Sequence, residues 1–220
     1  ITSTTATNTV TFSGNLTLTT GMTVGAGSAA YNVALNGSSN TIAGATTFLN
    51  TGTVTLGNGS DTSAFTGGVV ATAPSSVTVN GTVTAAGTGV ITLGDSDTAV
   101  SVIGTGTIGG TSTGQITLGA VTVSTTKTLT IGAGATTPIS LTTVSGPVTG
   151  SADVTFNTLG AVSVSGAVGT NLGTLTITNS GGTTFSSTVN AATVAITSTT
   201  ATNTVTFSGN LTLTTGMTVG

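Results

Sequence analysis

Short runs in which one hydroxyl residue stands between two apolar residues recur along the whole chain. Eight of them are the most regular, with Thr at the centre of seven and Ser at the centre of the other. Alternation with period two is typical of a strand with one apolar and one polar face. The pattern predicts short strands whose apolar residues form the core, namely Leu16, Leu18, Val54, Leu56, Val77, Val79, Ile91, Leu93, Ile116, Leu118, Leu129, Ile131, Val162, Val164, Leu175 and Ile177.

Residues that favour turns separate these runs. The stretch GNGSD at 57–61, the NG pairs at 36–37 and 80–81, and the GG pairs at 67–68, 109–110 and 181–182 are of this kind. Gly, Asn and Asp favour turns because they tolerate backbone conformations that other residues avoid. We therefore expect strands of about 3–6 residues with frequent turns between them.

The chain also carries an internal repeat. Residues 1–25 return without a single change at 196–220, so the repeat period is 195 residues. Self-similarity of this kind is typical of repeat architectures. We interpret 1–220 as one continuous segment of a longer array, in which 1–195 is one repeat and the next copy starts at Ile196.

The repeat decides between two all-β architectures. Tandem sandwich domains would show a linker at their boundary, and no change of composition marks one here. A solenoid needs no boundary because each coil contacts only its neighbours. We therefore predict an all-β protein, a β-solenoid or parallel β-helix. With about 20 residues per coil it has roughly nine or ten coils per repeat, and each repeat rises by about 45 Å.

The amino-acid composition excludes several classes of function. Charged residues are 2% of the chain, and His, Cys and Trp are absent. The usual nucleophile and acid–base sets cannot be built from what remains, so we expect neither catalysis nor a cofactor. A net charge of −3 gives no basic patch for nucleic acid. The chain has no run of 18 apolar residues, so the sequence predicts no transmembrane helix.

Asp95 and Asp97 are the weak candidates for a metal site. Two carboxylates two residues apart share a face of a strand and are hard ligands of the kind that Ca²⁺ prefers. The simpler interpretation is a polar turn in which Asp accepts backbone hydrogen bonds, because the related stretch LGNGSDT ends in the same way around Asp61.

The texture of NLTLTTGMTVG, TFLNTGTVTLGNG and TFSSTVNAATVAIT resembles the β-strand-repeat segments of large bacterial surface proteins. These include filamentous-haemagglutinin-like adhesins and autotransporter passengers. The resemblance is compositional and covers the whole chain. It implies a right-handed β-helix, export from a bacterium, and a place on the cell surface or outside the cell. The chain departs from that group in its long repeat without changes, which favours a uniform fibre.

Three functions follow as hypotheses. The first is a structural segment of an extracellular fibre, such as a sheath, biofilm matrix or surface fibril. Its partner is then itself, end to end and through lateral bundling. The second is the stalk of an adhesin that meets other cells through a binding tip elsewhere. The third is ice binding by Thr-x-Thr rows, which needs regular spacing on one flat face.

Overall fold

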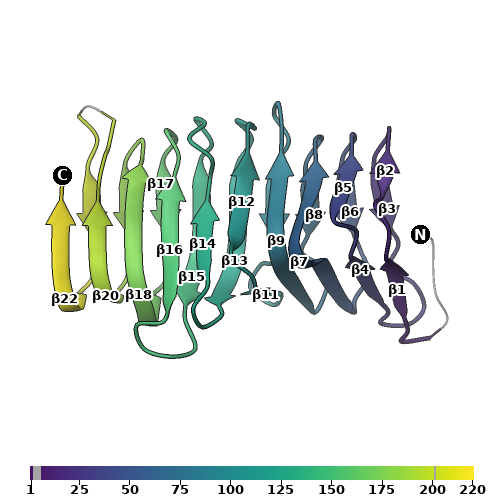
Figure 1. Ribbon diagram of the computed structural model, residues 1–220, viewed down its shortest axis with the longest axis horizontal. Helices are drawn as coiled ribbons and strands as arrows, with labels where there is room; N and C mark the ends of the chain where they lie inside the picture. Colours follow the sequence, from purple (N-terminus) through teal and green to yellow (C-terminus); the bar gives the residue numbers. More distant parts are fainter. Residues whose placement is uncertain (2–5, 201) are drawn as a thin grey trace.

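The computed structural model describes residues 1, 6–200 and 202–220, and these form a parallel β-solenoid of about 9 turns. Figure 1 shows the coils side by side along the long axis, with the N-terminus at one end and the C-terminus at the other. All strand pairs are parallel and in one 22-stranded sheet. The described residues contain no helix. The predicted all-β solenoid is thus confirmed.

Each coil has three faces, which the chain visits in the order face I, face II, face III. On face I, Val10 pairs with Val33, then the ladder continues through Val54 and Val77. On face III, Ile91 pairs with Ile116. The coil that separates Ile91 from Ile116 is longer than the one that separates Val33 from Val54, and both slightly exceed the length per coil that the sequence suggested.

The strands group by the faces that they occupy. Those confined to face I are β1 (Thr9–Phe12), β4 (Asn32–Leu35) and β11 (Ala99–Val102). Those on face II alone are β2 (Thr17–Leu18), β5 (Ser39–Ile42), β12 (Gly106–Gly110), β14 (Thr128–Ile131) and β16 (Ala152–Asn157). Those on face III alone are β3 (Met22–Val24), β6 (Thr46–Phe48), β8 (Val69–Ala71), β10 (Ile91–Leu93), β17 (Val162–Val164), β19 (Thr183–Phe185) and β21 (Val205–Phe207).

The remaining strands run around a corner. Strands β7 (Thr53–Phe65), β9 (Ser76–Ala85), β18 (Val168–Asn179), β20 (Val189–Ile196) and β22 (Leu211–Val219) join face I to face II. Strands β13 (Ile116–Val123) and β15 (Ile139–Ser145) join face III to face I. The prediction that every strand is short was therefore wrong for these, since β7 has 13 residues.

The stretches GNGSD and Asn80-Gly81 explain the difference. Both were expected to end a strand, and both lie inside one, in β7 and β9. Gly57 and Gly81 adopt φ values of 87° and 134°, which bend the strand at the corner. The ladder tolerates the bend with a register shift between Leu56 and Asp61.

The core is a set of apolar ladders that run along the solenoid axis. On face I, Val54, Val77, Val100 and Val121 lie in one ladder and are all buried. Each buried Val contributes about 1.5–3 kcal/mol to stability. Ladders of stacked apolar residues therefore form a continuous narrow core along the axis. Of the sixteen core residues predicted, fourteen are buried, and Leu16 and Leu18 in the first coil are partly buried.

Candidate interaction surfaces

A column of hydroxyl residues runs along face III from β10 to β21, whereas Val70 takes the same position in β8. The residue at the centre of each apolar triplet points outward, and the register stacks these residues directly on one another. The column contains Thr92, Thr117, Ser140, Ser163, Thr184 and Thr206. Neighbouring strands lie about 4.8 Å apart, so this face offers regularly spaced, uncharged donors and acceptors.

Face II carries two parallel rows over a few coils. One row stacks Thr107, Thr130, Thr155 and Thr176 in register. In the row beside it, Thr128 pairs with Asp153, whose Oδ1 accepts a hydrogen bond of 2.7 Å from the Thr174 backbone N–H. The carboxylate thus interrupts the second row of threonines while it ties two coils together.

Asp95 lies in the turn after β10 and closes it. Its Oδ1 accepts hydrogen bonds from the backbone N–H groups of Asp97 and Thr98 at 2.9 and 3.0 Å. Asp61 acts in the same way, since its Oδ2 accepts from the Asn58 N–H at 2.7 Å. Within the described residues no group of three acidic, His or Cys side chains gathers. The hydrogen bonds of Asp95 therefore stabilise the turn that follows β10.

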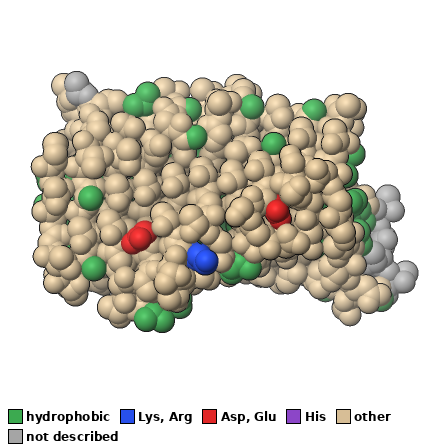
Figure 2. All heavy atoms as spheres, in the orientation of Figure 1, with side chains coloured by type: hydrophobic (Ala, Val, Ile, Leu, Met, Phe, Trp, Pro, Cys, Tyr) green, Lys and Arg blue, Asp and Glu red, His purple; other side chains and the backbone are tan. Residues whose placement is uncertain are grey.

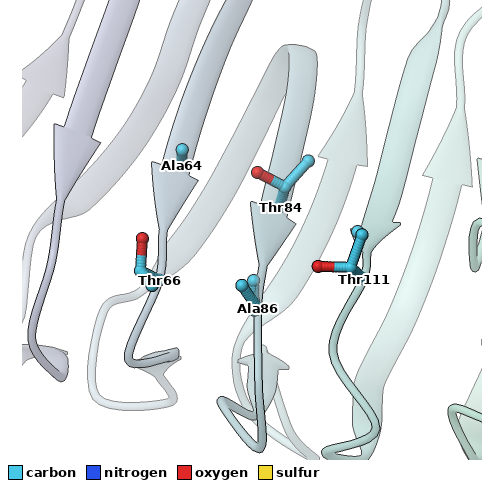
Figure 3. Close-up of a pocket in the computed structure, with 7 residues that line it drawn as sticks. Ala64, Thr66, Thr84, Ala86 and Thr111 are labelled. Carbon is cyan, nitrogen blue, oxygen red and sulfur yellow. The ribbon is translucent and has the colours of Figure 1, made fainter.

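A hollow of about 250 Å³ lies on the outside near the end of face II. Ala64, Thr66, Thr84, Ala86 and Thr111 line it (Figure 3). Methyl and hydroxyl groups are its chemistry, and none of its lining residues is charged or titratable in the physiological range. Figure 2 shows the same character on a larger scale, with few charged side chains scattered over the face in view.

A second set of hydroxyls lies inside the corner between faces II and III, where the sequence pattern did not predict it. Ser112, Thr137 and Thr158 are buried. Each donates to a backbone carbonyl of the preceding coil: Ser112 to Gly89 at 2.6 Å, Thr137 to Ser112, and Thr158 to Thr137. This internal ladder satisfies corner carbonyls that the strands leave free. The shared signal is a Ser or Thr a few residues ahead of each face III strand.

The open edges of the first and last coils are the remaining surfaces. In the last coil Met217 and Val219 are 51% and 65% exposed, although both belong to strand β22. The N-terminal coil leaves Val10, Phe12 and Leu16 only partly buried. Such edges present unpaired backbone groups and apolar side chains, which favours pairing with a further coil.

The described residues include no helix that is long and apolar enough to cross a membrane. Comparison with protein-family models, with curated proteins and with solved structures found no match to this chain.

Proposed function

We propose that this chain is a structural, non-catalytic segment of a long extracellular bacterial fibre built from tandem copies of the repeat. The observation that carries the proposal is the join between the two copies. Strand β21, the first strand that lies wholly in the second copy, pairs in register with β19 of the first. The Phe207 ring stacks on that of Phe185, with centroids 5.1 Å apart. The repeat thus passes into the next without a linker.

The surface chemistry supports a passive role. Four acidic residues and one basic residue are spread over 220 residues, and the outward columns are mostly Thr and Ser. A surface with so little charge is weakly protected against association, which favours lateral bundling in a sheath or matrix. The extracellular place of the fibre is carried by its resemblance to bacterial surface proteins.

The experiment compares recombinant chains of one, two and four repeats by electron microscopy. A fibre predicts a rod that lengthens by about 42 Å for each added repeat, at about 4.8 Å per coil. The control carries Thr206→Pro in every copy, since proline removes a ladder donor within a strand of the join. Beads separated by linkers in the unmodified chain would overturn the proposal.

A second candidate is the stalk of a cell-surface adhesin, which the same continuous ladder favours because it makes a stiff spacer. Its binding tip would lie outside these residues. Beads coated with the four-repeat chain should then fail to bind cells that the full-length protein binds. Equal binding by both would favour contact through the repeats themselves.

Ice binding is the third candidate, and the paired rows of face II are the feature that favours it. Thr130 and Thr128 lie beside each other in one coil, as do Thr176 and Thr174 two coils on. Asp153 interrupts the row that contains Thr128 and Thr174, while Thr155 continues the other row. Thermal hysteresis of the purified chain tests this function, and its absence at millimolar protein would remove it.

A further inference from the structure

The two copies of the 25-residue segment lie on different faces of the solenoid. In the first copy, the TVTF strand β1 is on face I, because Val10 pairs with Val33. In the second copy, the same letters form β21 on face III, because Val205 pairs with Thr183. The MTV strand moves in the same direction, from face III as β3 to face II as part of β22.

The displacement follows from the number of coils in one repeat. Met22 and Val205 lie in the same face III ladder, eight coils apart, through β6, β8, β10, β13, β15, β17 and β19. Val10 lies two faces before Met22 in the first coil. One repeat, from Val10 to its copy Val205, therefore spans eight coils and two faces, one face short of nine complete coils.

Between them, the two copies show both neighbours of the 25-residue segment in an array, the coil that follows it and the coil of the previous repeat that precedes it. The first copy shows what the segment contacts in the following coil: Phe12 pairs with Leu35, and Val24 with Phe48. The second copy shows what it contacts in the preceding coil, since Phe207 pairs with Phe185. Together they give each strand of the segment one neighbour on either side, with no vacant position in the ladder.

The space around the glycines of the segment also depends on which neighbouring coil is present. A Cβ at Gly14 would meet nothing within 4 Å, whereas at its copy Gly209 it would lie 2.5 Å from the carbonyl carbon of Ser187. At Gly21 it would lie 2.1 Å from the Ala45 carbonyl oxygen, whereas at Gly216 it would meet nothing. Gly209 meets the preceding coil, which Gly14 in the first coil lacks, and Gly21 meets the following coil, which Gly216 in the last coil lacks.

We propose that tandem copies of this repeat form a threefold screw, in which each copy starts one face earlier than the copy before it. This inference rests on the proposed fibre and specifies its symmetry. The edge of β22 is completed by the residues of the second copy that correspond to 26–50, displaced by one face relative to those of the first copy. Each copy rises by about 42 Å, and a given residue returns to the same face after three copies, about 125 Å along the axis.

The screw has a consequence for the surface of the fibre. A feature that occurs once per repeat, such as the Asp95 turn, is presented on three sides in succession. Every surface feature of the repeat therefore recurs on all three faces of the fibre. A neighbouring fibre meets the same side chains from whichever side it approaches. Copies of a partner that binds one site per repeat would therefore be distributed around the fibre and would not line up along one side.

Disulfide crosslinking in the 220-residue chain tests the face assignment. The chain has no Cys, so introduced pairs are the only thiols. Thr184 and Thr206 are direct neighbours on face III, and paired Cα atoms of adjacent strands lie within disulfide range. We expect T184C/T206C to oxidise nearly completely. The matched pair N190C/T206C joins face I to face III and should stay reduced.

The alternative phase gives the opposite result. If one repeat were nine complete coils, Thr206 would return to face I, beside the ladder of Asn190, and N190C/T206C would oxidise instead. That outcome, or the absence of crosslinking in T184C/T206C, would overturn the screw. N190C/T212C, a face I pair in the structure, checks that this region folds and oxidises.

Helical reconstruction of the four-repeat chain gives an independent measurement. The screw predicts a rise of about 42 Å with a rotation of about 120° per repeat, added to the twist of the coils themselves. The same rise without that rotation would leave the fibre intact and overturn the screw. Separate beads would overturn the fibre, while the crosslinks would still report the phase within one chain.

Discussion

The two copies of residues 1–25 have the same letters and different surroundings. Met22 is 7% exposed and its copy Met217 is 51% exposed, while Val24 and Val219 are 0% and 65% exposed. The first copy has the following coil above it, and the second has only the preceding coil below it. Burial of these side chains is therefore a property of the neighbouring coil and not of the local sequence.

The corner within the segment differs as well. In the first copy, Thr19–Gly21 lies outside any strand and separates β2 from β3. In the second copy, the same letters at 214–216 continue as part of the single strand β22, with Gly216 at a φ of 151°. The second copy lies on β20, which also runs around its corner without a break. The coil beneath thus selects how identical residues bend.

The largest expected difference between the copies concerns the valines. Val24→Asp places a carboxylate in the dry interior next to Phe48, which we expect to cost about 4 kcal/mol. Val219→Asp places it at an exposed edge and should change stability by about 0.5 kcal/mol or less. Urea unfolding followed by circular dichroism measures both. Equal midpoints for the two variants would contradict the difference in burial.

The glycine pair gives the next largest effect. Gly209→Ala forces a methyl group against the backbone of Ser187 and should cost about 1–3 kcal/mol. Gly14→Ala has open space and should be neutral or stabilising by a few tenths of a kcal/mol, as for compatible Gly→Ala changes generally. Thermal unfolding of the 220-residue chain compares them. With a further repeat fused ahead of Ile1, Gly14→Ala should become as costly as Gly209→Ala.

The phenylalanines should differ less. Phe207 stacks on Phe185 with an angle of 13° between the rings, whereas Phe12 pairs with Leu35. Because stacked rings contribute about 0.5–1.5 kcal/mol beyond burial, Phe207→Ala should destabilise the chain by about 1 kcal/mol more than Phe12→Ala. Differential scanning calorimetry resolves this difference. A larger loss for Phe12→Ala would show that the aromatic contact adds little.

Tyr31 gives the smallest effect. Burial raises the pKa of its hydroxyl above 10.0, and that hydroxyl donates to the Gly25 carbonyl at the end of the first copy. The folded chain therefore holds this proton more tightly than the unfolded chain. The resulting stability is present below pH 10 and is lost as the pH rises beyond it. We expect the free energy of unfolding to fall as the pH rises above 10 and through the folded pKa of Tyr31.

Tyr31→Phe is the control for this pH dependence. It removes the titrating hydroxyl and keeps the buried ring, so the part of the stability loss above pH 10 that comes from Tyr31 should vanish. Absorbance at 295 nm follows the ionisation of Tyr31 directly, since it is the one tyrosine of the chain. Ionisation near pH 10 in the folded chain would contradict the burial.

Much of the fold could be predicted from local patterns. The alternation at Val77-Thr78-Val79 places valines inside and the threonine outside, because a strand alternates its side chains strictly. The corners were harder. Asn80-Gly81 has the letters of a turn that ends a strand, yet β9 passes through it, because the coils above and below supply hydrogen bonds on both sides.

The surface was predicted less well than the core. The pattern indicated hydroxyl residues on the outside, and it did not distinguish Thr158, which is buried and bonds to the preceding coil, from Thr155, which faces outward. Both are threonines beside apolar residues. Only the path of the corner between faces II and III turns one of them inward.

The sequence by itself determined the alternation, the absence of helix in the described residues and the period of the repeat. These depend on side-chain shape and on spacing along the chain, which the letters contain. The tertiary structure decided how many residues complete a coil, and therefore on which face each copy begins. That choice depends on the sum of corners bent at glycines such as Gly57 and Gly81, each set by the coil beneath it.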